Sequence, residues 1–174
     1  MVDTTLTLII KNNQILLGEK KRKIGKGLLN GCGGKVEQGE DIEQAMIRET
    51  HEEWGIVPLD YRKCAMIQCE HDKAELSQRL HIFRAFNFEG SLIGTSEISM
   101  GQWFDLDKIP FDRMFPGDRE WMPLVLNNNF VIGKVHFDVD FNIVRQNYII
   151  RKRLTHLRAD CFGDTMVSSY GKEL

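Results

Sequence analysis

Three glutamates lie within five residues of one another in the first third of the chain. Glu49, Glu52 and Glu53 follow Arg48, and a glycine-rich segment at 30–34 precedes them. A helical step of about 100° per residue would place the three carboxylates within one third of a helix circumference. Carboxylates brought this close repel one another, and a bound divalent cation would offset that repulsion. Oxygen ligands alone favour a hard cation, Mg²⁺ or Mn²⁺, over zinc.

The helix that would carry these glutamates is predicted over 41–53, with Asp41 as a plausible N-cap. A solvated acidic face is the usual interpretation of such a cluster, but an ordinary surface helix places its acids opposite its apolar stripe. Here the apolar residues of the first half of the helix share the angular sector of the acids; they are Ile42, Ala45 and Met46. We therefore expect the acids beside the core, where lost hydration adds to the benefit of a cation.

The glycine-rich segment ahead of the helix lets the backbone approach a ligand closely. It is neither a dinucleotide-binding motif nor a P-loop, because Val36 stands where either motif would need Gly or Ser/Thr. We expect Arg48 to pair with Glu40 or to hold one of the glutamates in place. The alternative is an exposed ion pair that contributes little.

These residues resemble the Nudix box, the metal-binding signature of hydrolases that cleave a nucleoside diphosphate linked to a further group. The positions that carry the resemblance are Gly34, Glu40, Arg48, Glu49, Glu52, Glu53 and Gly55. Thr50 departs from the box, because the family usually has an aliphatic residue there. We expect Thr50 to affect packing more than chemistry.

The resemblance implies a set of metal ligands and a reaction. The ligands would be the backbone carbonyl of Gly33 and the carboxylates of Glu49, Glu52 and Glu53. Glu97 is the nearest candidate for a further acidic ligand from a later loop. Mg²⁺ would bridge phosphate oxygens and lower the pKa of an attacking water. Glu52 or Glu53 would position or deprotonate that water, and Arg48 would be the third catalytic residue.

Four further segments look like the oxidised-purine nucleoside triphosphate diphosphatases, the 8-oxo-dGTP hydrolases of the MutT-homologue group; they are residues 16–22, 29–36, 103–111 and 114–121. The resemblance spans about residues 3–151 and implies hydrolysis of oxidised purine nucleotides to a monophosphate and pyrophosphate. It also implies the substrate-binding residues Thr5, Lys20, Asn30, Lys35, Phe115, Asp118 and Trp121. Asn30 and Asp118 would hydrogen-bond the base edge, and Phe115 would stack on the base.

Several of these positions have a structural alternative. Asn30 could be a turn residue, and Phe115 and Trp121 could be core residues. The chain also departs from the family's pattern at base-contacting positions, which carry Gly117, Cys69 and His71. Two other functions therefore stay open. One is hydrolysis of another nucleotide, such as a methylated purine dNTP, an undamaged dNTP or a nucleotide sugar. The other is a non-catalytic nucleotide sensor.

Composition limits the class of protein. The 174 residues carry a net charge of −2 and are 42% hydrophobic, which suits one domain with a sizeable core. The chain has no excess of basic residues that would indicate a nucleic-acid partner, and no apolar run is long enough to span a membrane. The cysteines show no paired metal spacing and are interpreted as reduced thiols; they are Cys32, Cys64, Cys69 and Cys161. We expect a cytoplasmic monomer that binds a small-molecule nucleotide.

The elements that must position the site are mostly strands. Strands are predicted at 4–11, 14–18, 62–70, 79–88, 101–105, 130–137 and 140–149, and a second helix at 117–127. The basic run 20–26 would be a loop, either solvated or in contact with phosphates. The expected fold class is α/β, a Nudix-type α/β/α sandwich with a mixed central sheet and helices on its faces. We expect a hydrolase domain over 1–152 and a C-terminal extension of unknown role over 153–174.

Overall fold

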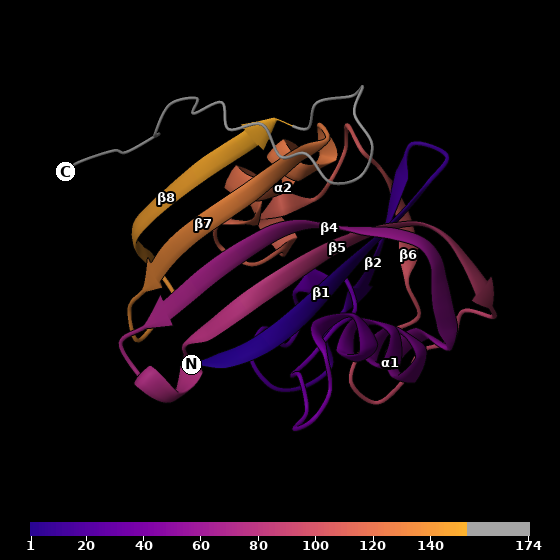
Figure 1. Ribbon diagram of the computed structural model, residues 1–174, viewed down its shortest axis with the longest axis horizontal. Helices are drawn as coiled ribbons and strands as arrows, with labels where there is room; N and C mark the ends of the chain where they lie inside the picture. Colours follow the sequence, from indigo (N-terminus) through magenta and orange to yellow (C-terminus); the bar gives the residue numbers. More distant parts are fainter. Residues whose placement is uncertain (153–174) are drawn as a thin grey trace. The chain divides into compact units, whose positions relative to one another are not determined.

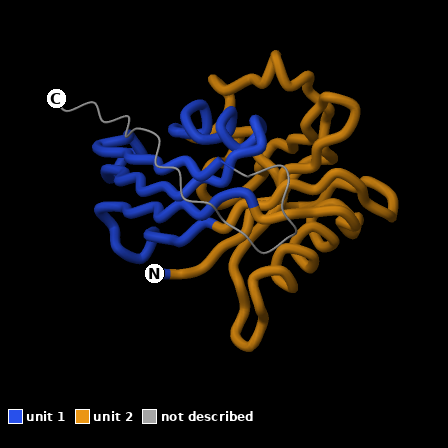
Figure 2. Tube along the Cα trace, turned by 45° about the horizontal axis from the view of Figure 1, so that its top comes forward, with its two compact units in different colours: residues 1, 64–80, 116–174 blue, residues 2–63, 81–115 orange. Residues whose placement is uncertain are grey.

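The computed structural model describes residues 1–152. The expectations for 153–174 and for Cys161 lie outside the described residues. The chain divides into two compact units, which are described separately (Figure 2). Unit 2 comprises residues 2–63 and 81–115, and unit 1 comprises Met1, residues 64–80 and the chain from Pro116 on.

The strands and helices follow the predicted order, and Figure 1 labels the helices and the longer strands. The strands are β1 (Val2–Lys11), β2 (Gln14–Glu19), β3 (Leu29–Asn30), β4 (Ile56–His71), β5 (Gln78–Gly90), β6 (Gln102–Asp105), β7 (Asn129–Phe137) and β8 (Ile143–Lys152). The helices are α1 (Ile42–Trp54) and α2 (Asp118–Leu126), with short 3-10 turns η1 (Ala74–Leu76) and η2 (Phe111–Arg113).

Each predicted strand is present, although some boundaries move. β3 was not predicted, because two residues are too short to show a periodic pattern. β4 begins at Ile56 instead of 62, since Gly55 adopts the left-handed conformation (φ 68°) and turns the chain from the helix directly into the strand. β8 begins at Ile143 instead of 140, because the Asp138 carboxylate accepts hydrogen bonds from backbone N–H groups in the preceding turn.

Strand pairing makes the sheet mixed, as predicted. In unit 2 the order is β3-β2-β1-β5-β4, with β6 on β2, and in unit 1 it is β5-β4-β7-β8. β1 and β2 form an antiparallel hairpin closed by Asn12 and Asn13, both with positive φ. β4 and β7 are parallel, whereas β7 and β8 are antiparallel. In unit 2, α1 lies against β1, and in unit 1, α2 lies against β7.

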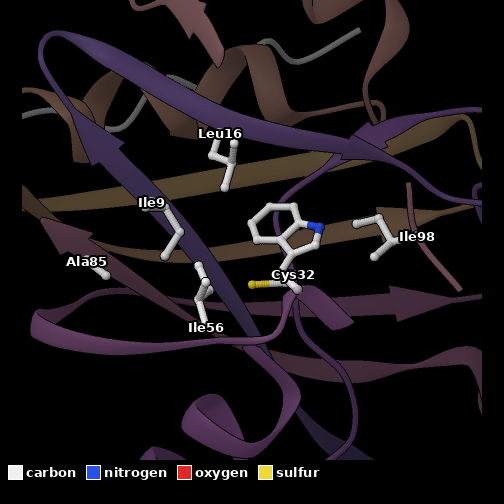
Figure 3. Packing of buried hydrophobic residues seen from close by; sticks show 7 residues of the cluster. Ile9, Leu16, Cys32, Ile56, Ala85 and Ile98 are labelled. Atoms are coloured by element: carbon white, nitrogen blue, oxygen red, sulfur yellow. The ribbon is translucent and has the colours of Figure 1, made fainter. Parts of the chain in front are cut away.

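The core of unit 2 lies beneath the end of α1. It is a cluster of fully buried side chains from the end of α1, several strands and two loops: Ile9, Leu16, Cys32, Trp54, Ile56, Ala85 and Ile98 (Figure 3). The indole Nε1 of Trp54 donates to the carbonyl of Ser99 at 3.2 Å. This packing fixes the C-terminal half of α1, which carries the glutamates. No helix in the described part of the chain has the length and apolar character needed to cross a membrane.

Candidate active site

Both ends of α1 are fixed by local interactions. The Asp41 carboxylate accepts hydrogen bonds from the backbone N–H groups of Glu43 and Gln44 at 2.9 and 2.8 Å. The Gln44 side chain accepts from the Asp41 N–H in return, which completes a capping box. At the other end the Gly55 N–H donates to the His51 carbonyl. The predicted N-cap at Asp41 is therefore confirmed, and the helix phase that orients the glutamates is set on both sides.

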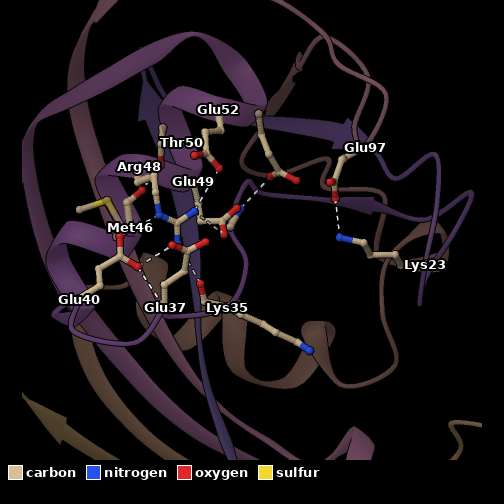
Figure 4. Close-up of polar contacts among 12 residues, drawn as sticks. Lys23, Lys35, Glu37, Glu40, Met46, Arg48, Glu49, Thr50, Glu52 and Glu97 are labelled. Atoms are coloured by element: carbon tan, nitrogen blue, oxygen red, sulfur yellow. Dashed lines mark hydrogen bonds and ion pairs between the residues drawn. The ribbon is translucent and has the colours of Figure 1, made fainter.

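Arg48 is the centre of the acidic cluster (Figure 4). Its guanidinium binds both oxygens of Glu40, at 2.8 and 2.9 Å. It also donates to Glu49 at 2.9 Å, to Glu52 at 3.1 Å and to the Lys35 carbonyl at 3.0 Å. Arg48 thus does both things expected of it, since it pairs with Glu40 and holds two of the glutamates. The guanidinium also keeps the pKa of the Glu40 carboxyl below its usual value.

The three glutamates differ in exposure. Glu53 is only 7% exposed, and burial raises its pKa to about 7. The Gly33 N–H, which donates to Glu53 at 2.9 Å, and the charge of Lys20 oppose that rise only in part. Glu49 is half-buried, and burial raises its pKa as well. The Glu52 side chain is 57% exposed, so two of the three acids lie beside the core as predicted and one faces solvent.

The glycine-rich segment lies so close to β1 and to Glu49 that a side chain would not fit at either Gly33 or Gly34. At Gly33 (φ 151°) a Cβ would lie 2.1 Å from the Thr5 carbonyl oxygen. At Gly34 a Cβ would lie 2.4 Å from Oε1 of Glu49. Isolated antiparallel bridges to β1 on both sides of the two glycines hold the segment in this position. The backbone beside Glu49 and Glu53 is therefore open to a ligand only because it is glycine.

The donor set fits a hard divalent cation. Among residues 1–152, no three His, Cys, Asp or Glu side chains already converge as a metal cage. Repulsion between like charges explains this, because Glu49 and Glu52 turn toward Arg48, whereas Glu53 turns toward the Gly33 N–H. All donors are oxygens, two of the carboxylates are desolvated, and the glycine backbone leaves room beside them. The predicted ligand set stays a prediction that this arrangement supports.

Glu97, the predicted further ligand, pairs with two cations of the basic run. Arg22 binds one of its oxygens and Lys23 the other, the latter at 2.9 Å. The charge of Glu97 nevertheless contributes to the raised pKa of both Glu49 and Glu53. It therefore lies within electrostatic range of the acidic cluster. The two ion pairs were not predicted, although the run of five basic residues at 20–26 was a signal that counter-charges were needed nearby.

The predicted substrate-binding residues of unit 2 have varied surroundings. Thr5 is buried, its N–H donates to the Gly34 carbonyl, and its hydroxyl has no hydrogen-bond partner among the described residues. Asn30 accepts a hydrogen bond from the Gly31 N–H, as a turn residue does. The Phe115 ring lies against the backbone of Gly25. Two further predicted residues are Lys20, which is half-buried, and Lys35, which is exposed.

Unit 1 contains Asp118 and Trp121, which the structure brings together at the start of α2. The buried Asp118 carboxylate accepts a hydrogen bond from the indole Nε1 of Trp121 at 3.0 Å. Burial and the Asp118 charge raise the pKa of Cys69 to about 12. Gly117 precedes the helix with φ 94°. His71 accepts a hydrogen bond from the Lys73 N–H and packs on another aromatic ring of unit 1.

Thr50 has a packing role, as expected. It is fully buried, and its hydroxyl donates to the Met46 carbonyl at 2.7 Å. The same oxygen lies 3.2 Å from the hydroxyl of Thr7 on β1 and 3.5 Å from the Cys32 sulfur. A small polar cluster thus replaces the aliphatic contact between the helix and the strand. This cluster could not be predicted from the sequence, because its members lie far apart along the chain.

The chain resembles known proteins over most of its length. A NUDIX domain model matches residues 2–125. The chain is 43% identical over 133 residues to an oxidized purine nucleoside triphosphate hydrolase of Danio rerio, covering 76% of this chain and 85% of that protein. The protein of that name from Mus musculus is 38% identical with the same coverage. A crystal structure of the mMutator MutT protein from Bacillus halodurans has a TM-score of 0.76 at 25% identity, covering 85% of this chain and 97% of that chain.

Proposed function

This chain belongs to the Nudix family, and from that premise we propose that it hydrolyses oxidised purine nucleoside triphosphates, such as 8-oxo-dGTP, to the monophosphate and pyrophosphate. The observation that carries the proposal is the acidic end of α1. There, Glu49 and Glu53 are desolvated beside a glycine backbone, and Arg48 holds Glu49 and Glu52. Two relatives similar over most of the chain are named for this activity.

Nudix hydrolases generally use a divalent metal ion, and we propose Mg²⁺, with Mn²⁺ as a substitute. It would be held by the carboxylates of Glu49, Glu52 and Glu53 and the carbonyl of Gly33, with Glu97 as a further ligand. When bound, such an ion supplies charge neutralisation at the polyphosphate and a water of lowered pKa.

Glu53 is the proposed proton acceptor for the attacking water. It is buried, the Gly33 N–H fixes its position, and its pKa of about 7 suits a base that works near neutral pH. Glu52 is exposed and hydrogen-bonded to Arg48, which favours a role in ligand binding instead. Arg48 orients Glu49 and Glu52 through charge-assisted hydrogen bonds, and Glu40 fixes the guanidinium from the other side.

Residues for recognition of the base are proposed separately within each unit, from the surroundings that each residue has there. In unit 1, the buried Asp118 carboxylate, oriented by Trp121, would accept or share a proton with the base edge. In unit 2, Asn30 would offer an amide, Phe115 an aromatic face and Thr5 a hydroxyl. Lys20 and Lys35 would contact phosphates. The cytoplasmic location, the monomeric state and the domain boundary at 152 stay predictions from the sequence.

A substrate panel tests the proposal. Initial rates with 8-oxo-dGTP, 2-hydroxy-dATP, dGTP and N6-methyl-dATP are compared, with pyrophosphate and phosphate measured separately. We expect one pyrophosphate per monophosphate and a kcat/KM at least about tenfold higher for an oxidised purine than for dGTP, equivalent to about 1.4 kcal/mol. Glu53→Gln is expected to lower kcat at least about a hundredfold, in the range of general-base catalysis. Release of inorganic phosphate, or full activity of Glu53→Gln, would contradict the proposal.

One observation favours a second candidate, hydrolysis of a different purine nucleotide. Gly117 supplies no side chain beside Asp118, and Cys69 is a small side chain near the same carboxylate. A site with a single carboxyl group for the base edge has fewer ways to select an oxidised base. The panel separates the two candidates, because this alternative predicts a higher kcat/KM for N6-methyl-dATP or dGTP than for 8-oxo-dGTP. A non-catalytic sensor would bind nucleotide without turnover in excess Mg²⁺.

A further inference from the structure

The basic run between β2 and β3 is a fixed loop of unit 2. Its backbone is tied to the 93–99 segment, because the Lys21 N–H donates to the Glu97 carbonyl at 2.8 Å. The ammonium of Lys21 donates to the Thr95 carbonyl at 2.6 Å. On the other side the Phe115 ring leaves no room for a side chain at Gly25, where a Cβ would lie 2.0 Å from the ring. The cations of the loop are therefore held in defined positions.

Two of these cations share one carboxylate. Arg22 binds one oxygen of Glu97, and Lys23 binds the other at 2.9 Å (Figure 4 shows the Lys23 pair). Both pairs lower the pKa of the Glu97 carboxyl. The side chains of Arg22 and Lys23 stay half or more exposed, at 50% and 68%. Water and solutes can therefore reach both cations in the paired state.

This three-residue group lies close to the acidic end of α1. The segment that carries Glu97 is bonded to the end of this helix, because the Trp54 indole donates to the Ser99 carbonyl at 3.2 Å and the Ile93 N–H donates to the Trp54 carbonyl at 3.0 Å. A polyphosphate bound at these acids through a divalent ion would bring several further negative charges to the same region. Its distal phosphates would need counter-charges that the carboxylates cannot supply.

We propose that Arg22 and Lys23 bind the two phosphates that leave as pyrophosphate, and that Glu97 holds both cations in place until a polyphosphate displaces it. This inference rests on the proposed function, since it assigns a binding site to the pyrophosphate product of that reaction. An exposed ion pair contributes little to stability, so the exchange costs little. A guanidinium binds phosphate oxygens in pairs, and an ammonium adds a compact charge, so the new contacts are stronger than the old ones.

The exchange gives the site a way to distinguish substrate from product. A nucleoside triphosphate carries the two distal phosphates, whereas the monophosphate product lacks them. Arg22 and Lys23 would strengthen binding of the triphosphate and leave binding of the monophosphate unchanged. Displaced from its cations, Glu97 would become available as the further acidic ligand near Glu49 and Glu53.

Calorimetric binding of inorganic pyrophosphate and of inorganic tripolyphosphate, measured both in EDTA and in excess Mg²⁺, tests the exchange without nucleotide turnover. Arg22→Ala and Lys23→Ala should each weaken binding about tenfold, the effect of losing one hydrogen bond to a charged group. Lys26→Ala is the matched control, because it removes one exposed positive charge from the same loop, and it should change binding less than about twofold. Thermal unfolding of each variant confirms that the fold is retained.

Glu97→Gln gives the sharper result. Releasing the two cations from their carboxylate should tighten pyrophosphate binding about threefold to tenfold, an effect opposite to that of structural damage. In the variant R22A/K23A/E97Q that gain should disappear, because the cations on which it depends are gone. Unchanged binding in R22A and K23A, an equal loss in K26A, no tightening in E97Q, or absence of pyrophosphate binding by the wild type would each overturn the inference.

The inference and the proposed function can fail separately. A wild-type chain that binds pyrophosphate with the expected variant pattern, but hydrolyses none of the nucleoside triphosphates, retains the inference about Arg22 and Lys23 as a polyphosphate site and loses the proposed reaction. A chain that hydrolyses 8-oxo-dGTP to pyrophosphate while R22A and K23A keep the wild-type KM and pyrophosphate affinity retains the reaction and loses the inference.

Discussion

Replacing Glu53 with glutamine should remove part of the pH dependence of the stability of the metal-free protein. Burial raises the pKa of Glu53 from 4.5 to about 7. Between about pH 4.5 and 7, Glu53 therefore keeps its proton in the folded protein, whereas it has lost that proton in the unfolded chain. The free energy of unfolding is therefore greatest below this pH window and falls as the pH rises through it. In EDTA the wild type should thus be less stable at pH 8 than at pH 5.

The size of the effect follows from the two pKa values. The difference of about 2.5 pH units corresponds to on the order of 3 kcal/mol of unfolding free energy. Glu49 is half-buried with its pKa also raised, so it adds to the loss of stability in the same direction. Glutamine at 53 keeps an oxygen for the Gly33 N–H but cannot ionise. Glu53→Gln should therefore be more stable than the wild type at pH 8 and show a flatter profile.

The free energy of unfolding at pH 5, 6, 7 and 8 is measured by urea unfolding in EDTA, followed by tryptophan fluorescence. Glu52→Gln is the matched control, because it makes the same chemical change at a side chain that is 57% exposed. The control should keep the wild-type profile. A wild type whose stability does not fall between pH 5 and 7, or a Glu53→Gln variant with the same fall as the wild type, would refute the assignment of the buried carboxyl.

Three further changes have defined outcomes. Arg48→Ala removes the charge-assisted hydrogen bonds of the acidic cluster and should destabilise the fold by about 1–3 kcal/mol in urea unfolding; Arg48→Lys should recover little, because an ammonium cannot bind both oxygens of Glu40. Gly33→Ala, with a Cβ 2.1 Å from the Thr5 carbonyl oxygen, should cost at least about 2 kcal/mol by the same measurement and abolish turnover. Trp121→Phe deprives a buried carboxylate of one donor and should cost about 1–3 kcal/mol, while Trp103→Phe serves as the fluorescence control.

The parts of the structure set by nearby residues were predictable. The cap at Asp41, the extent of α1 and the hairpin at Asn12-Asn13 depend on interactions within a few positions of the chain. The pairing of Arg48 with Glu40 spans eight positions and was anticipated from charge and spacing. Strand positions followed from alternating burial, whereas the start of β4 depended on the backbone conformation of Gly55.

Contacts between segments that are distant in the chain could not be predicted from a single sequence. Glu97 is 75 positions from Arg22, and no local pattern indicates that the two meet. The same holds for the ring of Phe115 against Gly25 and for the hydroxyls of Thr7 and Thr50. Such contacts depend on how strands pair, and pairing follows from burial of the whole chain instead of from neighbours in sequence.

The exposure of Glu52 was not predicted by its angular position on the helix. A step of about 100° per residue places Glu49, Glu52 and Glu53 in one sector, yet the sector is wide enough for its edge to face solvent. In the structure Glu53 is buried, Glu49 is half-buried and Glu52 is exposed. A helix wheel therefore identified the acidic cluster correctly but could not assign different roles to its members.

Metal binding tests the central claim most directly. Manganese bound by the wild type and by the triple variant Glu49→Gln/Glu52→Gln/Glu53→Gln can be counted by electron paramagnetic resonance at equal protein concentration, with and without a non-hydrolysable nucleotide. We predict saturable binding by the wild type, stronger with nucleotide, and at least about a hundredfold weaker binding by the triple variant, since three charged ligands are lost. Equal manganese affinity in the two proteins would show that these carboxylates do not hold the metal.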